Sequence, residues 1–133
     1  MRGRPAARAA APPAPEVLVT HTNLYRVVPG TPVTVEIVIG DAQVGGSALT
    51  LNGVPIPLDS GTRRAIVGQP GQSLVGSILQ CATTVQDVNP LTNKTSVTHH
   101  FTGGLAAQSF PFAVEVSADS GLARYLITFL FTA

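Results

Sequence analysis

Three histidines are the first residues that could support metal binding or acid–base chemistry. His99 and His100 are adjacent, and His21 lies far away in the sequence. Adjacent side chains of a β-strand point to opposite faces of the sheet, so His99 and His100 cannot easily bind one metal ion. We interpret them as ordinary strand residues, one facing the core and one facing solvent. A metal site that combines His21 with one of them and Asp87 stays an open alternative.

The acidic residues indicate turns and exposed strand positions rather than a catalytic pair. Asp41, Asp59 and Asp119 lie beside glycine or serine, where an aspartate usually accepts hydrogen bonds from its own backbone. Glu36 and Glu115 have apolar neighbours in predicted strands, so both are expected to face solvent. Hydrolysis of a glycoside would need two acids on opposite sides of one bond, and the sequence nominates no such pair.

The candidate nucleophiles do not stand in a recognisable catalytic motif. The segment Gly71-Gln72-Ser73-Leu74-Val75 begins like the Gly-x-Ser-x-Gly elbow of hydrolases but lacks its second glycine. Cys81 has no neighbouring cation and is expected to be a small buried hydrophobe. As the single cysteine, it allows neither an internal disulfide nor a cysteine-based zinc site. We therefore expect no enzymatic activity, no cofactor and no metal.

The charge of the chain argues against a nucleic-acid partner. Charged residues make up 11% of the sequence, against about 25% in an average soluble domain. Arg2, Arg4 and Arg8 lie in the first fifteen positions, so the remainder has more acids than bases. Nucleic-acid binding draws on clustered Lys and Arg, which this remainder lacks. A surface rich in Thr, Ser, Gln, Asn and Gly is compatible with extracytoplasmic proteins and assembly subunits, so we expect a secreted or periplasmic location.

The composition divides the chain at about residue 15. Residues 1–15 are Ala, Pro and Arg without periodicity and are expected to form a disordered arm. Residues 16–133 are expected to form one domain, because 44% hydrophobic residues can supply a core without metal or disulfide support. No apolar run approaches the length of about 18 residues that a transmembrane helix needs.

From Glu16 onward, the pattern predicts an all-β fold. Short β-branched runs are broken by Gly, Pro, Asn and Asp at intervals of about 8–12 residues, which is typical of sandwiches and barrels. Within 31–39, valine and isoleucine alternate from Val33 to Ile39 and predict one core-facing side. Asn52-Gly53 between two apolar runs predicts a hairpin, and the prolines within 54–58 push its second arm towards a sheet edge.

We therefore predict an antiparallel β-sandwich of about 7–9 strands. It resembles immunoglobulin-like modules only in a generic sense, because the Cys…Trp…Cys spacing of that family is absent. The segment 73–88 is ambiguous, because the apolar residues of 73–82 also fit one face of a helix. An internal glycine and the β-branched residues 83–85 favour a long strand, with 95–102 as its hairpin partner.

The last predicted strand, 122–131, is apolar on both faces and suggests where a partner would bind. Such a strand is either central in the fold or covered by another chain, and we favour the central position because a long apolar edge invites aggregation. Tyr125, Phe129 and Phe131 on one face are the candidate ligand or interface residues.

The leading hypothesis is a non-enzymatic binding or assembly module, extracytoplasmic or surface-associated. Its partner would be a protein or a surface, with self-association as one option. The alternative is a carrier of a small apolar ligand, held in a β-barrel pocket that these aromatic residues line. An enzyme of unreadable class is third, because fold analogy alone does not establish a function.

Overall fold

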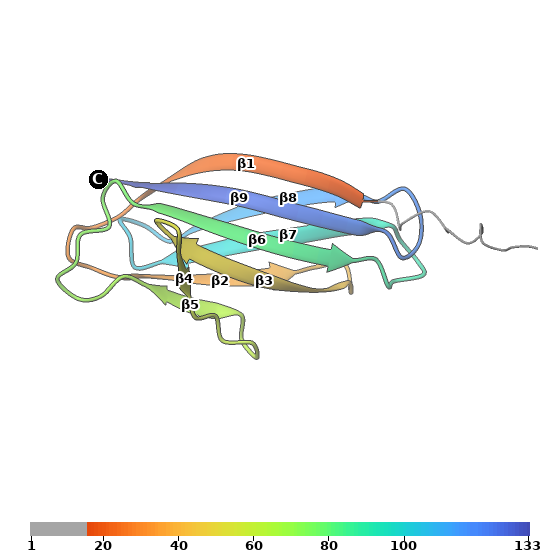
Figure 1. Cartoon of the computed structure of the whole chain (residues 1–133), viewed down its shortest axis with the longest axis horizontal. Helices are drawn as coiled ribbons and strands as arrows, with labels where there is room; N and C mark the ends of the chain where they lie inside the picture. Colours follow the sequence, from red (N-terminus) through yellow and green to blue (C-terminus); the bar gives the residue numbers. More distant parts are fainter. Residues whose placement is uncertain (1–15) are drawn as a thin grey trace, which may run out of the picture.

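A computed structural model describes residues 16–133, and in this range the chain forms nine β-strands in two packed sheets (Figure 1). The fold class predicted from the sequence is confirmed, whereas the predicted arm 1–15 lies outside the described residues. No helix in the described range is long and apolar enough to cross a membrane. The strands are β1 (Glu16–Arg26), β2 (Val33–Ile39), β3 (Val44–Leu51), β4 (Val54–Ile56), β5 (Arg64–Val67), β6 (Ile78–Gln86), β7 (Lys94–Thr102), β8 (Gln108–Glu115) and β9 (Leu122–Thr132).

The first and last strands meet in the larger sheet. The five-stranded sheet has the order β1-β9-β6-β3-β4, and the four-stranded sheet has the order β5-β2-β7-β8. β1 runs parallel to β9 along its full length, from Glu16 opposite Leu122 to Arg26 opposite Thr132. All other neighbouring strands are antiparallel. The sandwich is therefore antiparallel with one long parallel pair at an edge, which the sequence did not indicate.

The predicted hairpin between 73–88 and 95–102 is wrong, although both segments contain strands. β6 pairs with β3 and β9, whereas β7 pairs with β2 and β8 in the opposite sheet. Each strand buries every second side chain, so the two pack face to face across the core instead of side by side. β6 also begins later than predicted, at Ile78, because Gly76 has a φ of 84° and Ser77 closes a turn by donating to Leu74 O.

Two turns follow their predicted chemistry. Asn52 and Gly53 have φ values of 50° and 83°, the left-handed pair that a type I′ hairpin turn requires. The hairpin ends in β4, which lies at the edge of its sheet as its prolines predict. Gly71, with a φ of 87°, occupies the left-handed position of a turn in which Gln72 N donates to Gln69 O over 3.0 Å.

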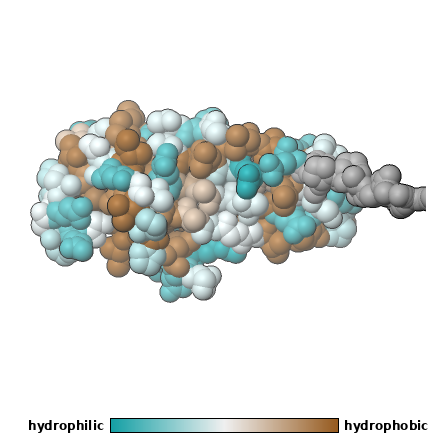
Figure 2. Space-filling view, in the orientation of Figure 1, coloured by the Kyte–Doolittle hydropathy of each residue, from teal (hydrophilic) through white to brown (hydrophobic). Residues whose placement is uncertain are grey.

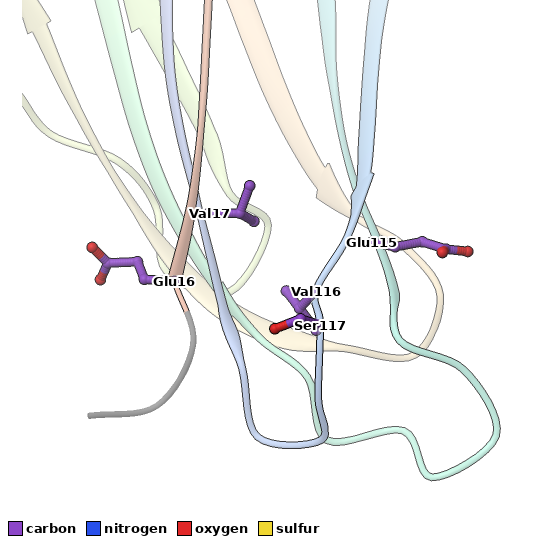
Figure 3. Close-up of a pocket in the computed structure, with 5 residues that line it drawn as sticks. All are labelled: Glu16, Val17, Glu115, Val116 and Ser117. Carbon is purple, nitrogen blue, oxygen red and sulfur yellow. The ribbon is translucent and has the colours of Figure 1, made fainter. Parts of the chain in front are cut away.

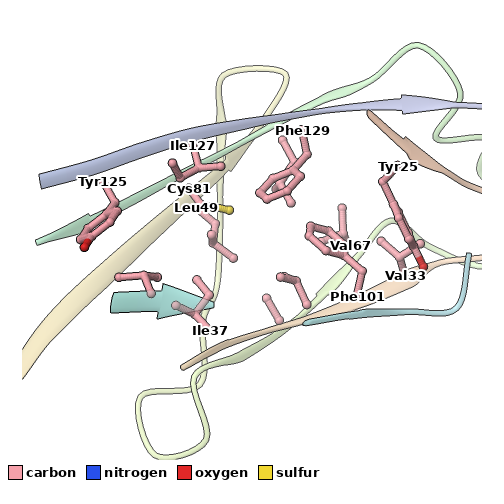
Figure 4. Close-up of a cluster of buried hydrophobic side chains, with 14 of the residues drawn as sticks. Tyr25, Val33, Ile37, Leu49, Val67, Cys81, Phe101, Tyr125, Ile127 and Phe129 are labelled. Atoms are coloured by element: carbon pink, nitrogen blue, oxygen red, sulfur yellow. The ribbon is translucent and has the colours of Figure 1, made fainter. Parts of the chain in front are cut away.

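The core lies between the sheets and is filled by the inward faces of the long strands (Figure 4). Val33, Val35 and Ile37 of β2 are 0–2% exposed, as their alternation predicts. β9 lies between β1 and β6, which confirms its predicted central position. Its inward residues Tyr125, Ile127, Phe129 and Phe131 are at most 1% exposed.

Aromatic rings connect the two sheets. The ring centroids of Phe101 and Phe129 lie 4.6 Å apart, and those of Tyr25 and Phe101 lie 4.8 Å apart. His99 belongs to the same cluster, with its ring centroid 5.2 Å from that of Phe129. Its side chain is fully buried, and neither ring nitrogen has a hydrogen-bond partner. Burial therefore lowers the pKa of His99 to about 4.

Truncation of Phe129 should destabilise the protein strongly. The Phe129→Ala variant loses a fully buried ring and leaves a cavity, so we expect a loss of about 3–5 kcal/mol in the free energy of unfolding. Leu126→Ala is the matched control, because Leu126 lies on the outward face of the same strand and is 43% exposed. Urea denaturation of both variants measures the difference. Equal midpoints for Phe129→Ala and the parent would contradict a central β9.

The buried imidazole of His99 should make stability depend on pH. The folded-state pKa lies near 4 and the ordinary value is 6.5, so between these pH values the unfolded chain binds a proton that the folded chain does not. The free energy of unfolding should fall as pH falls through this window, by about 1.4 kcal/mol per pH unit and about 3 kcal/mol in total.

Replacement of this imidazole should remove that pH dependence. Between the same two pH values, the free energy of unfolding of His99→Leu should fall by less than that of the parent protein. His100→Gln, on the outward face of the same strand, should keep the parental slope because it retains the buried imidazole. An unchanged slope in His99→Leu would show that other groups cause the acid sensitivity.

Candidate functional site

The three aromatic residues expected to contact a ligand or a partner lie in the core. Tyr125, Phe129 and Phe131 are at most 1% exposed and are not accessible from outside in this structure. The Tyr125 hydroxyl donates to Thr95 Oγ1 over 2.6 Å, and the Thr95 hydroxyl in turn donates to Val114 O over 2.8 Å. These residues therefore join the two sheets, and burial raises the pKa of Tyr125.

The histidines are placed as the strand pattern predicts. His99 faces the core, and His100 faces outward with Nδ1 2.6 Å from Ser109 Oγ. His21 of β1 packs on Phe112 of β8, with ring centroids 5.0 Å apart. Within residues 16–133, His, Cys, Asp and Glu side chains form no group of three that could hold a metal ion.

Cys81 is a buried hydrophobe, as predicted. Its side chain is fully buried in β6 among the core residues. Burial raises the pKa of the Cys81 thiol to about 12, because an apolar environment disfavours the thiolate. The side chain therefore lacks the ionised, accessible sulfur that nucleophilic catalysis needs.

A surface hollow lies on the open side of the sandwich, between β1 and the end of β8 (Figure 3). It has a volume of about 250 Å³ and is lined by Glu16, Val17, Glu115, Val116 and Ser117. The two carboxylates point away from each other, and Glu16 pairs instead with Arg124 at 3.7 Å. The hollow therefore contains two acids without the convergence that a catalytic pair requires.

Hydrophobic residues are interspersed with hydrophilic ones on the outer surface of the five-stranded sheet (Figure 2). Leu18 and Leu24 are 62% and 60% exposed, and Leu126 and Ile78 are each 43% exposed. We call the following twelve outward-facing residues the neutral face: Leu18, Thr20, Thr22, Leu24, Ala48, Thr50, Ile78, Gln80, Ala82, Leu126, Thr128 and Leu130.

The strand registers bring these side chains together in rows. Leu126 lies opposite Thr20 on one side and Ala82 on the other, and Leu130 lies between Leu24 and Ile78. Among the described outward positions of β1, β9 and β6, the charged residues are Glu16 and Arg124 towards one end of the sheet and Arg26 at the other, and Arg124 lies opposite Leu18. The neutral face is thus a set of uncharged rows that borders Arg124 beside Leu18.

The outer surface of the four-stranded sheet has a different character. It carries Glu36 and Arg64, which form an ion pair at 3.8 Å, together with Lys94 and Glu115 on β7 and β8. The predicted exposure of Glu115 is confirmed, and Glu36 is partly exposed. Both outer surfaces therefore carry charged residues, and on the five-stranded sheet these lie around the neutral face.

Polar side chains gather where three connections meet at one end of the molecule. Asp87 is 3% exposed, and Asp119 follows β8 in the chain. The Asn93 side-chain nitrogen donates to Asp87 Oδ2 over 2.7 Å and to Asp119 Oδ1 over 2.9 Å. The predicted turn bonds of aspartate hold for Asp59, whose Oδ1 accepts from Gly61 N and Thr62 N, and these bonds lower its pKa.

Sequence reasoning missed both the neutral face and the polar cluster. The outward residues of 122–131 were recognised as apolar, but the neighbours that extend them into a surface depend on the pairing of β9 with β1 and β6. The cluster depends on residues from separate connections, which no local pattern brings together. Within 18–24, the uncharged residues at every second position, Leu18, Thr20, Thr22 and Leu24, were a local signal for this face.

Comparisons of the chain with protein-family models, with curated proteins and with solved structures gave no significant match.

Proposed function

We propose that the chain is a non-enzymatic assembly module that binds a second copy of itself through the neutral face. The supporting observation is a sheet surface on which leucines up to 62% exposed stand among threonine, glutamine and alanine. Contiguous exposed apolar surface on a soluble domain commonly marks a protein interaction site, because its burial releases water from apolar side chains.

The absence of charge supports a second copy as the partner. A charged surface repels its own copy, and it selects a partner of opposite charge. At the end of the neutral face, Glu16 and Arg124 already pair with each other, so they leave little charge to select a different partner. A neutral surface is complementary to itself, which is the requirement for a two-fold symmetric interface.

Three features support a binding role over catalysis or transport. The described strands form two open sheets, whereas the carrier hypothesis expects a closed barrel. The inward aromatic residues fill the space between these sheets, where a ligand pocket would have to lie. Cys81 is buried and un-ionised, and the acids of the β1–β8 hollow diverge. A secreted or periplasmic location remains part of this proposal and is supported by the low content of charged residues.

A charge placed in the centre of the neutral face should prevent association. In Leu126→Lys, symmetric contact would bring two desolvated ammonium groups close together, so we expect the dimerisation constant to weaken at least about tenfold, or about 1.4 kcal/mol. Sedimentation equilibrium from ~1 µM to ~1 mM covers the range in which weak interfaces dissociate. The parent protein should change from monomer to dimer within that range.

Ile66→Lys provides the matched control. Ile66 is 68% exposed on β5, at the edge of the other sheet, so its replacement adds the same charge away from the neutral face. This variant should associate like the parent. A parent protein that stays monomeric throughout the range would contradict the proposal, as would equal weakening by both substitutions.

A further inference from the structure

β1 is the longest of the four strands that lie at a sheet edge. It has eleven residues, and within residues 16–133 only β9 pairs with it, so its other side has no neighbouring strand (Figure 1). A row of unpaired backbone N–H and C=O groups is a template on which another chain can add a strand. The free side of β1 is therefore a candidate interaction surface.

The other three edge strands carry features that hinder such pairing. β4 and β5 have only three and four residues. β4 also contains Pro55 and β8 contains Pro111, and proline lacks the backbone donor that a neighbouring strand needs. β1 has no proline, and its one acidic and one basic residue, Glu16 and Arg26, stand at its two ends. β1 therefore lacks the protection that edge strands usually have.

The hydrogen bonds at the end of β1 show which backbone groups point to its free side. Val27 N donates to Thr132 O of β9 over 2.7 Å, whereas Arg26 O accepts from Leu105 N of the β7–β8 connection over 3.0 Å. Successive residues of a strand direct their backbone groups to opposite sides, and the β1–β9 register is unbroken. The even-numbered residues of 16–26 therefore point to the free side, where Arg26 O already has a partner.

The even-numbered side chains of β1 form a pattern that is complementary to itself. In chain order they are Glu16, Leu18, Thr20, Thr22, Leu24 and Arg26. A second copy, placed antiparallel about a two-fold axis at His21, brings unlike charges together at both ends, leucine opposite leucine, and threonine opposite threonine. A shift by two residues in either direction removes both charge pairs, so the side chains favour this one register.

We propose that β1 pairs edge to edge with β1 of a second copy, in the antiparallel register centred on His21. In this register, the even-numbered residues 18–24 face one another and exchange both N–H and C=O bonds with their opposites. The two five-stranded sheets then join into one continuous sheet. This contact goes beyond the proposed contact of the neutral face, because it uses backbone hydrogen bonds and a different two-fold axis.

The charges at the ends of β1 support a second copy as the partner. Glu16 Oε2 lies 3.7 Å from Arg124 Nε of its own chain, and its other oxygen is left for Arg26 of the second copy. Both residues are exposed, so each end of the paired strands gains one ion pair without burying a charge. Two strands that pair without further packing form a weak contact, so we expect it at higher concentration than the contact of the neutral face.

Amide hydrogen exchange of the full chain, measured by NMR at ~0.05 mM and ~2 mM, tests this pairing. In the monomer, the amides of the even-numbered residues 18–24 are open to water, whereas those of the odd-numbered residues 19–23 point to β9. Where about nine tenths of the chains are paired, exchange at the even-numbered residues should slow about tenfold, and the odd-numbered ones should change little. Equal exchange of the even-numbered amides at both concentrations would overturn the proposal.

Leu126→Lys separates the edge contact from the contact of the neutral face. Leu126 lies on β9, so its replacement puts a charge on the neutral face and leaves the β1 sequence unchanged. The alternating protection of 18–24 should persist in this variant, even if its sedimentation shows that the neutral face does not associate. Protection that appears in the parent protein and disappears in Leu126→Lys would assign it to the neutral face and overturn the edge pairing.

Charge reversal tests the register. Arg26→Glu places two carboxylates opposite each other at both ends, so the pairing constant should weaken about fivefold. The double variant Glu16→Arg with Arg26→Glu restores unlike charges and should regain most of the protection. Equal protection in the parent, the single and the double variant would overturn the proposed register.

Thr22→Pro tests the backbone bonds. It removes a donor on the free side without removing a donor to β9, so a folded variant should lose the alternating protection at ~2 mM. A folded Thr22→Pro that keeps the parental protection would overturn the pairing. The charge variants decide if this variant does not fold.

Discussion

The contact between Phe101 of β7 and Phe129 of β9 is the interaction on which the arrangement of the sheets depends. Tyr25, Phe110 and Phe131 all pack on Phe101, and Phe110 also contacts Phe129, so one aromatic cluster joins β1, β7, β8 and β9. Since side chains alternate along a strand, the inward position of Phe129 forces Thr128 and Leu130 to the outer surface. The pairing of β9 with β1 and β6 then places a leucine and an isoleucine beside Leu130, and a threonine and a glutamine beside Thr128. The neutral face is therefore a consequence of the core.

The local parts of this fold could be predicted from the sequence, whereas the pairing of distant strands could not. Alternation identified Val33, Val35 and Ile37 as core residues, and Asn52-Gly53 identified the β3–β4 turn. Both signals lie within one strand or one turn. β6 and β7 lie in opposite sheets because their buried faces meet across the core, which depends on long-range contacts. Their proximity in the sequence alone predicted a hairpin instead. The parallel β1–β9 pair joins the two ends of the described chain and leaves no local signal.

The same distinction explains the candidate sites. The sequence predicts Tyr125, Phe129 and Phe131 as candidate ligand or interface residues, and the structure buries them between the two sheets. The interior is thus filled by its own side chains, and any binding must use the surface. The neutral face is a broad surface suited to a weak and reversible protein contact, because its burial would remove apolar side chains from water.

Methyl NMR of the parent protein over a concentration series tests the central claim, that the neutral face binds a second copy, most directly. Leucine, isoleucine and valine methyl groups report on both outer surfaces in one sample. If two copies meet through the neutral face, the methyl resonances of Leu18, Leu24 and Leu126 should shift or broaden together as concentration rises, whereas those of Val38 and Ile66 on the opposite surface should stay fixed. Unchanged resonances on the neutral face, or concentration-dependent shifts confined to Val38 and Ile66, would contradict it.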